Sequence, residues 1–136
     1  MSQTSDAERA IHRHFEAINQ RGHAGYVGTV AFPFTYQNYN GVSVTVNSPS
    51  DYGGPEAPYP WDIIAKTDPT WSHSELTGVI ELARTQHSAV FKVSFVRVDA
   101  TGSRSEIYDA VWIVVPGEDH WRVVFRHNMG RSQVAS

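Results

Sequence analysis

Polar and apolar residues alternate along most of the C-terminal half of the chain. The run 89–98 is apolar at almost every second position, 106–115 is apolar on both faces apart from the two acids Glu106 and Asp109, and 121–128 continues the pattern. A period of two is typical of β-strands, and the segments 99–103 and 116–119 supply the Gly, Pro and Asp residues that tight turns need. The pattern predicts three consecutive antiparallel strands, one face of which must be buried by the N-terminal half.

The first twenty residues carry a helical pattern instead. Ser5 and Glu8 have the spacing of a capping box, and Arg21-Gly22 ends the periodic stretch, so a helix is expected over 5–20. Its apolar positions fall on one stripe, which consists of Ala7, Ala10, Ile11, Phe15 and Ile18. A second, shorter helix is expected over 23–30, and Pro33 closes it.

The middle of the chain predicts a hairpin, a long loop and a fourth long strand. The hairpin strands, 34–38 and 42–46, flank an Asn-Gly dipeptide, which is typical of tight hairpin turns. Residues 47–60 are rich in Pro and Gly and indicate a loop, which is either a lid or binding loop or an insertion without a role. A short helix over 61–66 and a strand over 71–83 complete the order.

Composition and charge narrow the class of protein. Helices followed by strands are typical of an α+β protein, and 136 residues suffice for one domain over 1–136, with 1–4 and 131–136 expected to be flexible. The absence of cysteine excludes disulfides and thiolate sites, and a net charge of −3 argues against nucleic acid as a partner. The chain shows no signal peptide and no apolar run near the ~18 residues of a membrane span, so we expect a cytoplasmic protein that does not enter a membrane.

Three local patterns carry a resemblance that covers nearly the whole chain. They are the helix exit Ala17-Ile18-Asn19-Gln20-Arg21-Gly22, the strand-to-turn pattern Phe95-x-Arg97-x-Asp99-x-x-Gly102, and the last strand Trp121-Arg122-Val123-Val124 followed by Arg126. With the order and length of the elements, they resemble the nuclear transport factor 2-like superfamily, also called SnoaL-like or cystatin-like.

The resemblance implies an α+β cone, in which N-terminal helices pack in the concave face of a curved, mainly antiparallel sheet. Sheet and helices would enclose a mostly apolar pocket. The superfamily includes ketosteroid isomerase, scytalone dehydratase, polyketide cyclases and limonene epoxide hydrolase, and also non-catalytic binding or dimerisation modules. Fold alone therefore selects no function.

Strand alternation predicts which side chains face that pocket. A four-residue turn over 116–119 puts Val115 opposite His120, and hence Asp109 opposite Arg126. With the resemblance, the concave face then holds Phe91, Val93, Phe95, Arg97, Ile107, Asp109, Val111, Ile113, Arg122, Val124, Arg126 and Asn128, joined by Tyr36 and Asn38 from the hairpin. The opposite face would hold Tyr108, Ala110, Trp112, Val123, Phe125 and His127. So many large apolar groups favour a homodimer packed through the sheet.

Asp109 is the first candidate for chemistry. A carboxylate in a central apolar strand needs a partner, and two interpretations stay open: a structural pair with Arg126, or a general acid or base tuned by burial and a nearby phenol. By resemblance to the dehydratases, the candidate catalytic set is Tyr36, His73 and Asp109. Asn38 stands where the isomerases have their base, and an amide cannot abstract a proton.

The expected ligand is an anionic or apolar small molecule. The candidate substrate-binding residues are Asn38, Arg126, Asn128, Arg97, Phe95 and Val111. Arginines that face the cavity with only Asp109 to balance them suit a carboxylate, bound bidentately. The alternative is that Arg97 and Arg122 lie at the rim in solvent.

The usual metal and cofactor patterns do not occur in the sequence. It contains no His-x-x-x-His or Glu-x-x-His spacing, no phosphate loop and no dinucleotide fingerprint, so we expect neither a metal nor a cofactor. His73 either reaches the pocket mouth or is a hydrogen-bonded structural residue. Two function classes remain: a cofactor-free lyase, isomerase or cyclase, and a non-catalytic ligand-binding or dimerisation module.

Overall fold

The computed structural model describes residues 5–133, so the expected flexibility of 1–4 and 134–136 lies outside the described part, whereas Arg131 belongs to a strand. The helices are α1 (Asp6–Gln20), α2 (His23–Val27) and α3 (Pro60–Thr67), with a short 3-10 turn, η1 (Pro49–Asp51), before α3. The strands are β1 (Val30–Asn38), β2 (Ser43–Val46), β3 (Trp71–Arg84), β4 (Ala89–Asp99), β5 (Tyr108–Val115) and β6 (Arg122–Arg131).

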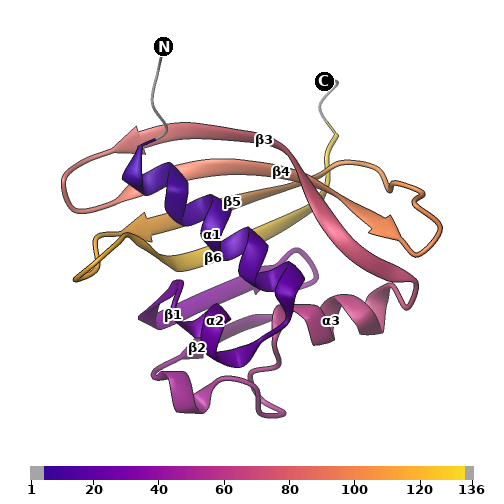
Figure 1. The fold of residues 1–136 in the computed structure, drawn as a ribbon, viewed down its shortest axis with the longest axis horizontal. Helices are drawn as coiled ribbons and strands as arrows, with labels where there is room; N and C mark the ends of the chain where they lie inside the picture. The colour runs from indigo at the N-terminus through magenta and orange to yellow at the C-terminus, as the bar shows by residue number, and fades with distance from the viewer. Residues whose placement is uncertain (1–4, 134–136) are drawn as a thin grey trace.

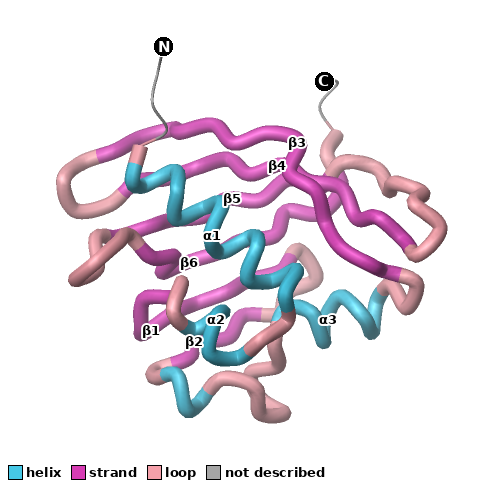
Figure 2. The backbone as a smooth tube through the Cα atoms, viewed as in Figure 1, coloured by secondary structure: helices cyan, strands magenta, loops and turns pink. Residues whose placement is uncertain are grey.

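The six strands form one curved sheet in the order β2-β1-β6-β5-β4-β3. All neighbours are antiparallel except β1 and β6, which run parallel. Helix α1 crosses the sheet in front of β5 and β6, and α2 lies beside its end on the same side (Figures 1 and 2). This is the expected α+β cone, with helices packed on the concave face of a mainly antiparallel sheet. No helix within residues 5–133 is long and apolar enough to cross a membrane.

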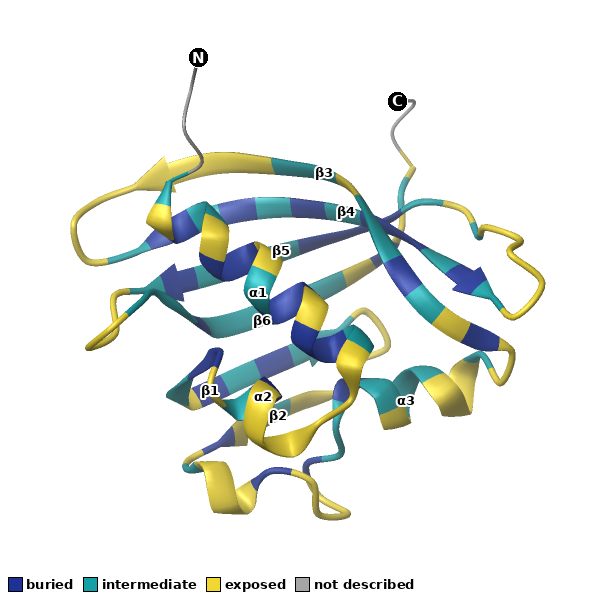
Figure 3. Ribbon diagram, viewed as in Figure 1, coloured by how far each residue is buried: buried dark blue, intermediate teal, exposed yellow. Residues whose placement is uncertain are grey.

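Helix α1 begins and ends as its sequence predicts. The Ser5 hydroxyl accepts a hydrogen bond from the Glu8 amide, and Arg21 ends the helix in the left-handed conformation. Its buried face turns to the sheet and its exposed face to solvent (Figure 3). The second helix is shorter than expected, because the chain already enters β1 at Val30, and Pro33 lies within that strand rather than closing the helix.

The predicted register of the last hairpin is wrong. Val115 pairs with Arg122 rather than His120, because the connection is two residues longer than a four-residue turn. Val124 is then an extra residue on β6, since Val114 pairs with Val123 but Ile113 pairs with Phe125. A bulge of one residue moves every later side chain of the strand to the other face.

As a result, Arg126 pairs with Trp112 and not with Asp109. On β5, the side chains that were expected on the outer face lie on the concave face. Asp109, Val111 and Ile113, expected on the concave face, lie on the outer face. Tyr108, Ala110, Trp112 and Val123 are buried in the core and do not form a dimer face. Of the residues expected on the outer face, only Phe125 and His127 are there, opposite Ile113 and Val111.

Candidate functional site

A cavity of about 120 Å³ lies between the concave face of the sheet and helices α1 and α3. Its apolar wall is made by Phe15, Ile18, Ile63, Ile64, Phe95, Ala110 and Trp112. Its polar groups come mainly from the ends of β1 and β6 and from β4, and they include Tyr36, Asn38, Arg97, Arg126 and Asn128. The cavity is smaller than the roughly 300–1,000 Å³ of drug-sized pockets, and close to the ~150 Å³ that holds a benzene ring.

The hollow in the sheet coincides with one small residue. Ala110 lies on β5 between the large rings of Tyr108 and Trp112, which point to the same face two residues away on either side. Its neighbours across the sheet are Val93 and Asn128. Because alanine carries only a methyl group, the layer of side chains on the concave face is thinnest at Ala110, and the cavity lies above this residue.

Arg126 reaches from β6 into a buried polar cluster beside the cavity. Its Nη1 atom lies 2.6 Å from His14 Nε2 and 2.8 Å from the hydroxyl oxygen of Tyr26. Both partners are fully buried. The guanidinium carbon also lies 5.1 Å from the ring centre of Phe34 and 5.9 Å from that of Tyr36. Aromatic faces and neutral hydrogen-bond acceptors therefore surround the positive charge.

Hydrogen bonds fix the tautomer of His14. The Thr29 hydroxyl donates its single proton to the backbone carbonyl of Tyr26, so it accepts a hydrogen bond from His14 Nδ1 at 2.8 Å. Nε2 is thus free of a proton and accepts from Arg126. Burial, and then the charge of Arg126, hold the pKa of His14 well below its usual value. His14 is neutral and orients the guanidinium.

The positive charge of Arg126 has no anionic partner among residues 5–133. None of the ion pairs in the described region includes it. Burial raises the pKa of Tyr26, Tyr36 and Tyr52, that of Tyr36 to about 12, so these phenols stay protonated. Burial alone would lower the pKa of Arg126, but Tyr26 and Tyr52 outweigh it and keep the guanidinium charged.

Arg97 adds a second cation to the same cavity. Its guanidinium lies over the ring of Tyr108, 4.6 Å from the ring centre, and its buried Nε atom has no hydrogen-bond partner in the described chain. No Asp, Glu, Lys or His is among the described residues that line the cavity. The lining is therefore positive, although the chain as a whole has a net charge of −3. Such a site attracts anions.

The structure brings six of the sequence-predicted site residues to one cavity and leaves three outside it. Those at the cavity are Tyr36, Asn38, Phe95, Arg97, Arg126 and Asn128. Val111 is on the outer face of the sheet, opposite His127. Asp109 is on that face too and accepts a hydrogen bond from Ser94 Oγ at 2.7 Å. The hydrogen bond from Ser94 lowers the pKa of Asp109, contrary to the expected tuning by a phenol.

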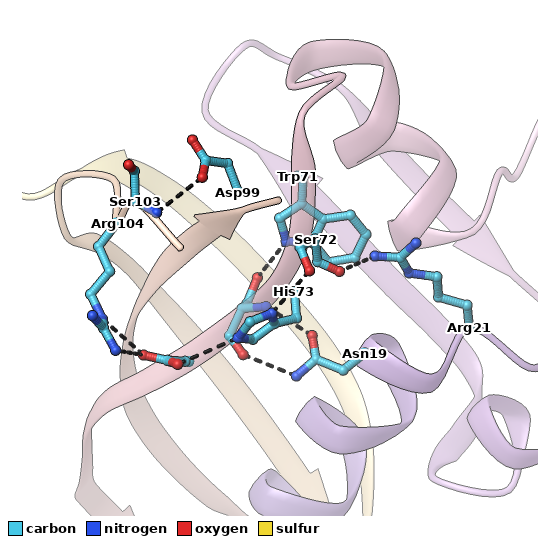
Figure 4. Close-up of polar contacts among 10 residues, drawn as sticks. Asn19, Arg21, Trp71, Ser72, His73, Asp99, Ser103 and Arg104 are labelled. Carbon is cyan, nitrogen blue, oxygen red and sulfur yellow. Dashed lines mark hydrogen bonds and ion pairs between the residues drawn. The ribbon is translucent and has the colours of Figure 1, made fainter. Parts of the chain in front are cut away.

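His73 belongs to a polar cluster on β3, outside the cavity (Figure 4). Its Nε2 atom lies 3.4 Å from the Glu75 carboxylate, which also binds Arg104. The next residue, Ser74, is held at its backbone N–H and C=O by the side-chain amide of Asn19. His73 is thus a hydrogen-bonded surface residue, and Tyr36, His73 and Asp109 do not converge as a catalytic set.

The sequence contains a pattern that predicts burial of His14. It is easily missed when His12 and His14 are considered only as a possible pair of metal ligands. His14 lies three residues after Ile11 and four before Ile18, so it falls on the apolar stripe of α1. A polar residue on such a stripe is buried and needs partners. Trp112 and Ala110 carried no comparable signal, because their side of the sheet depends on the register of β5 and β6.

The fold resembles that of many solved structures, whereas no family model and no curated protein matches the sequence. A cystatin-like protein of unknown function from Nostoc punctiforme superposes with a TM-score of 0.69 at 12% identity, covering 98% of both chains. An NTF2-like protein with a cystatin-like fold from Novosphingobium aromaticivorans gives 0.64 at 12% identity, covering 93% of this chain and 80% of that one.

An NTF2-like superfamily protein from Salmonella enterica gives a TM-score of 0.57 at 14% identity, and the match covers 93% of this chain and 89% of the other. Identities this low establish the fold and leave the activity open. The chain therefore has the NTF2-like, cystatin-like α+β cone fold.

Proposed function

We propose that the protein binds a small organic anion in its cone and holds the anionic group at Arg126. The observation that carries the proposal is the guanidinium of Arg126, charged, flanked by buried neutral groups and without a carboxylate partner in the described chain. A buried charge is costly unless it is paired. A carboxylate ligand supplies the missing charge.

Arg126 has donors left for such a ligand. A guanidinium carries five N–H donors, of which His14, Tyr26 and Tyr52 take at most three. At least two therefore remain (5 − 3 = 2), the number that a carboxylate uses in bidentate binding. Because Arg126 lines the cavity, a ligand there reaches these donors.

The lining favours binding over acid–base catalysis. A general base must sit within hydrogen-bond reach of the substrate and have a pKa near the working pH. Of the described lining residues, only two tyrosines and two arginines ionise, and Tyr36 has a pKa of about 12. A lyase or isomerase mechanism would thus have to start from a phenol that is protonated at neutral pH.

Binding of benzoate, measured by titration calorimetry, tests the proposal. We expect the wild-type chain to bind benzoate and to prefer it at least tenfold over benzamide, which has the same shape without the charge. Replacing Arg126→Met should weaken benzoate binding roughly 30-fold, since a hydrogen bond to a charged group contributes about 2 kcal/mol.

Arg122→Met is the matched control for this substitution. Arg122 lies on the same strand, pairs with Asp119 and does not line the cavity, so its loss should leave benzoate binding unchanged. Equal binding of benzoate and benzamide, or equal weakening by the two substitutions, would show that Arg126 is no anion site.

We also propose that two copies of the chain associate through the outer face of the sheet. The apolar side chains of Val90, Val111, Ile113 and Phe125 are only half buried there. The buried Nδ1 atom of His127 on the same face has no hydrogen-bond partner in the described chain. An apolar patch of this kind suits a two-fold dimer, in which the same surface of each copy meets the other.

Light scattering will check this association. The wild-type particle should have twice the 15.2 kDa mass of the chain. Phe125→Glu should yield the single-chain mass, because it places a charge in the centre of the face. Val42→Glu, at the exposed tip of the β1–β2 hairpin, should keep the double mass. A wild-type particle of 15.2 kDa would refute the dimer.

A further inference from the structure

The cavity has a second polar position, two residues along the strands from Arg126. In the parallel pairing of β1 with β6, Tyr36 is opposite Arg126, and Asn38 is opposite Asn128. The two pairs are two residues apart on their strands, so they face the same side of the sheet, and their Cα atoms are about 6.7 Å apart along each strand. Residues that are paired across neighbouring strands form a row across the sheet. The cavity therefore has the guanidinium of Arg126 on one row and the carboxamides of Asn38 and Asn128 on the next.

The two carboxamides have hydrogen-bonding capacity to spare. Asn128 Oδ1 accepts a hydrogen bond from the Gly130 amide, which leaves its Nδ2 group as a donor. The side chain of Asn38 makes no hydrogen bond to the described chain, and both residues line the cavity. Together they offer one acceptor and several donors to a ligand. A hydroxyl group, which donates one proton and accepts others, complements this pair.

The apolar surface on β5, beside Arg126 and Asn128, suits a flat apolar ring. Ala110 lies next to Asn128 across the sheet and forms the low floor, while Trp112 is opposite Arg126. Phe15 and Phe95, whose ring centres are 6.0 Å apart, add aromatic walls. A volume of about 120 Å³ holds one six-membered ring.

We infer that the ligand is a single-ring aromatic carboxylate with a hydroxyl group on the far side of the ring. Its carboxylate binds Arg126, its ring lies over Ala110 between the aromatic walls, and its hydroxyl donates to Asn38 and accepts from Asn128. The inference rests on the proposed function, because it requires Arg126 to hold the anion. It adds the ring and the second polar group, which the anion site alone does not specify.

Arg97 offers a competing second position. It lines the same cavity without an ion pair in the described chain, so a ligand with two carboxylates would have a cation for each. The carboxamide row is favoured because it adjoins the row of Arg126, whereas Arg97 lies on β4, the second strand over from β6. A comparison between a hydroxyl and a second carboxylate on the same ring decides between them.

Titration calorimetry with 4-hydroxybenzoate, 4-methoxybenzoate, terephthalate and cyclohexanecarboxylate on the wild-type chain is the test. We expect 4-hydroxybenzoate to bind about tenfold more tightly than benzoate, 4-methoxybenzoate to lose this advantage with its donor, and cyclohexanecarboxylate to bind more weakly than benzoate. In Asn38→Leu the ratio of the dissociation constants of benzoate and 4-hydroxybenzoate should fall from about ten to about one. Asn47→Leu, at an exposed position away from the cavity, should keep the ratio.

The outcomes separate this inference from the proposed function. If benzoate binding depends on Arg126 but the hydroxyl group adds nothing, or if terephthalate binds most tightly, the inference is wrong and the anion site stands. If benzoate binding does not depend on Arg126, both are wrong. The comparison of ligands uses the wild-type chain alone, so it remains decisive even if Asn38→Leu does not fold.

Discussion

Replacing Tyr52→Ala will lower the free energy of unfolding by about 3–5 kcal/mol, although Tyr52 lies in an irregular segment. The residue is only 4% exposed. Its ring stacks between those of Tyr36 and Tyr59, at centre distances of 6.4 and 5.5 Å, and its hydroxyl lies 2.7 Å from that of Tyr26. Alanine would leave a cavity beside the polar cluster and remove the hydrogen bonds of the Tyr52 hydroxyl with Tyr26 and Arg126. Chemical denaturation measures the loss.

Two substitutions separate packing from hydrogen bonding in this result. Tyr52→Phe keeps the ring and should cost about 1 kcal/mol for the lost hydroxyl. Tyr39→Ala removes the same ring from a position that is 64% exposed, and should change stability by less than about 0.5 kcal/mol. If Tyr52→Ala is as stable as Tyr39→Ala, the segment 47–60 is a loosely attached insertion. If it is strongly destabilised, the segment belongs to the core, and its role is to support Tyr26 and Arg126.

The sequence predicts the elements of this protein better than their register. Alternating apolar residues locate all six strands to within a few residues, and the Asn-Gly dipeptide locates the first hairpin, where Gly41 has a φ of +92°. These signals are local, because each depends on a few neighbouring side chains. The α+β cone follows from the order of the elements and from their resemblance to known proteins.

Which face of the sheet each side chain of β5 and β6 occupies could not be predicted, because it depends on one extra residue in β6. The extra residue in β6, Val124, is apolar like its neighbours, so nothing in its identity marks a bulge. Both faces of β5 are also mainly apolar, so that hydrophobicity does not select a register. The bulge moved Asp109 out of the cone and left Arg126 inside it without the carboxylate expected to balance its charge.

The wrong register of β5 and β6 also explains which residues of the site could be predicted from the sequence. Tyr36, Asn38 and Arg126 come from strands β1 and β6, which pair with each other, so their relative positions do not depend on the register of β5. Ala110 and Trp112 do depend on it, and they shape the cavity floor. A positively charged cavity was expected, with Asp109 balancing part of the charge. Because Asp109 lies on the outer face instead, no carboxylate of the described lining balances Arg97 and Arg126.

Acid will destabilise the protein through His14, and His14→Gln will remove most of this effect. In the folded chain His14 is fully buried beside Arg126, and burial, followed by the charge of Arg126, holds its pKa well below 6.5. In the unfolded chain it binds a proton near pH 6.5. Because the unfolded state then binds more protons, the contribution of neutral His14 to stability is complete above pH 6.5 and is lost as the pH falls.

The size of the loss follows from the number of pH units crossed. Each unit below pH 6.5 costs about 1.4 kcal/mol while the folded chain keeps His14 neutral, so between pH 7.5 and 4.5 the wild type should lose up to about 2.7 kcal/mol more than His14→Gln. Urea denaturation at several pH values measures the difference. At neutral pH the variant is the less stable protein, since glutamine cannot donate to Thr29 and accept from Arg126 with the same geometry, and the two curves approach each other in acid.

His12→Gln is the control, on the same helix two residues away. The His12 side chain is about half exposed, and within residues 5–133 its only hydrogen bond is with Glu8, so its replacement should keep the pH dependence of the wild type. Parallel stability curves for wild type and His14→Gln would mean that His14 takes up a proton equally in both states. Arg126 would then lack a neutral acceptor at Nε2, and the guanidinium would not be held in place for an anion as the structure indicates.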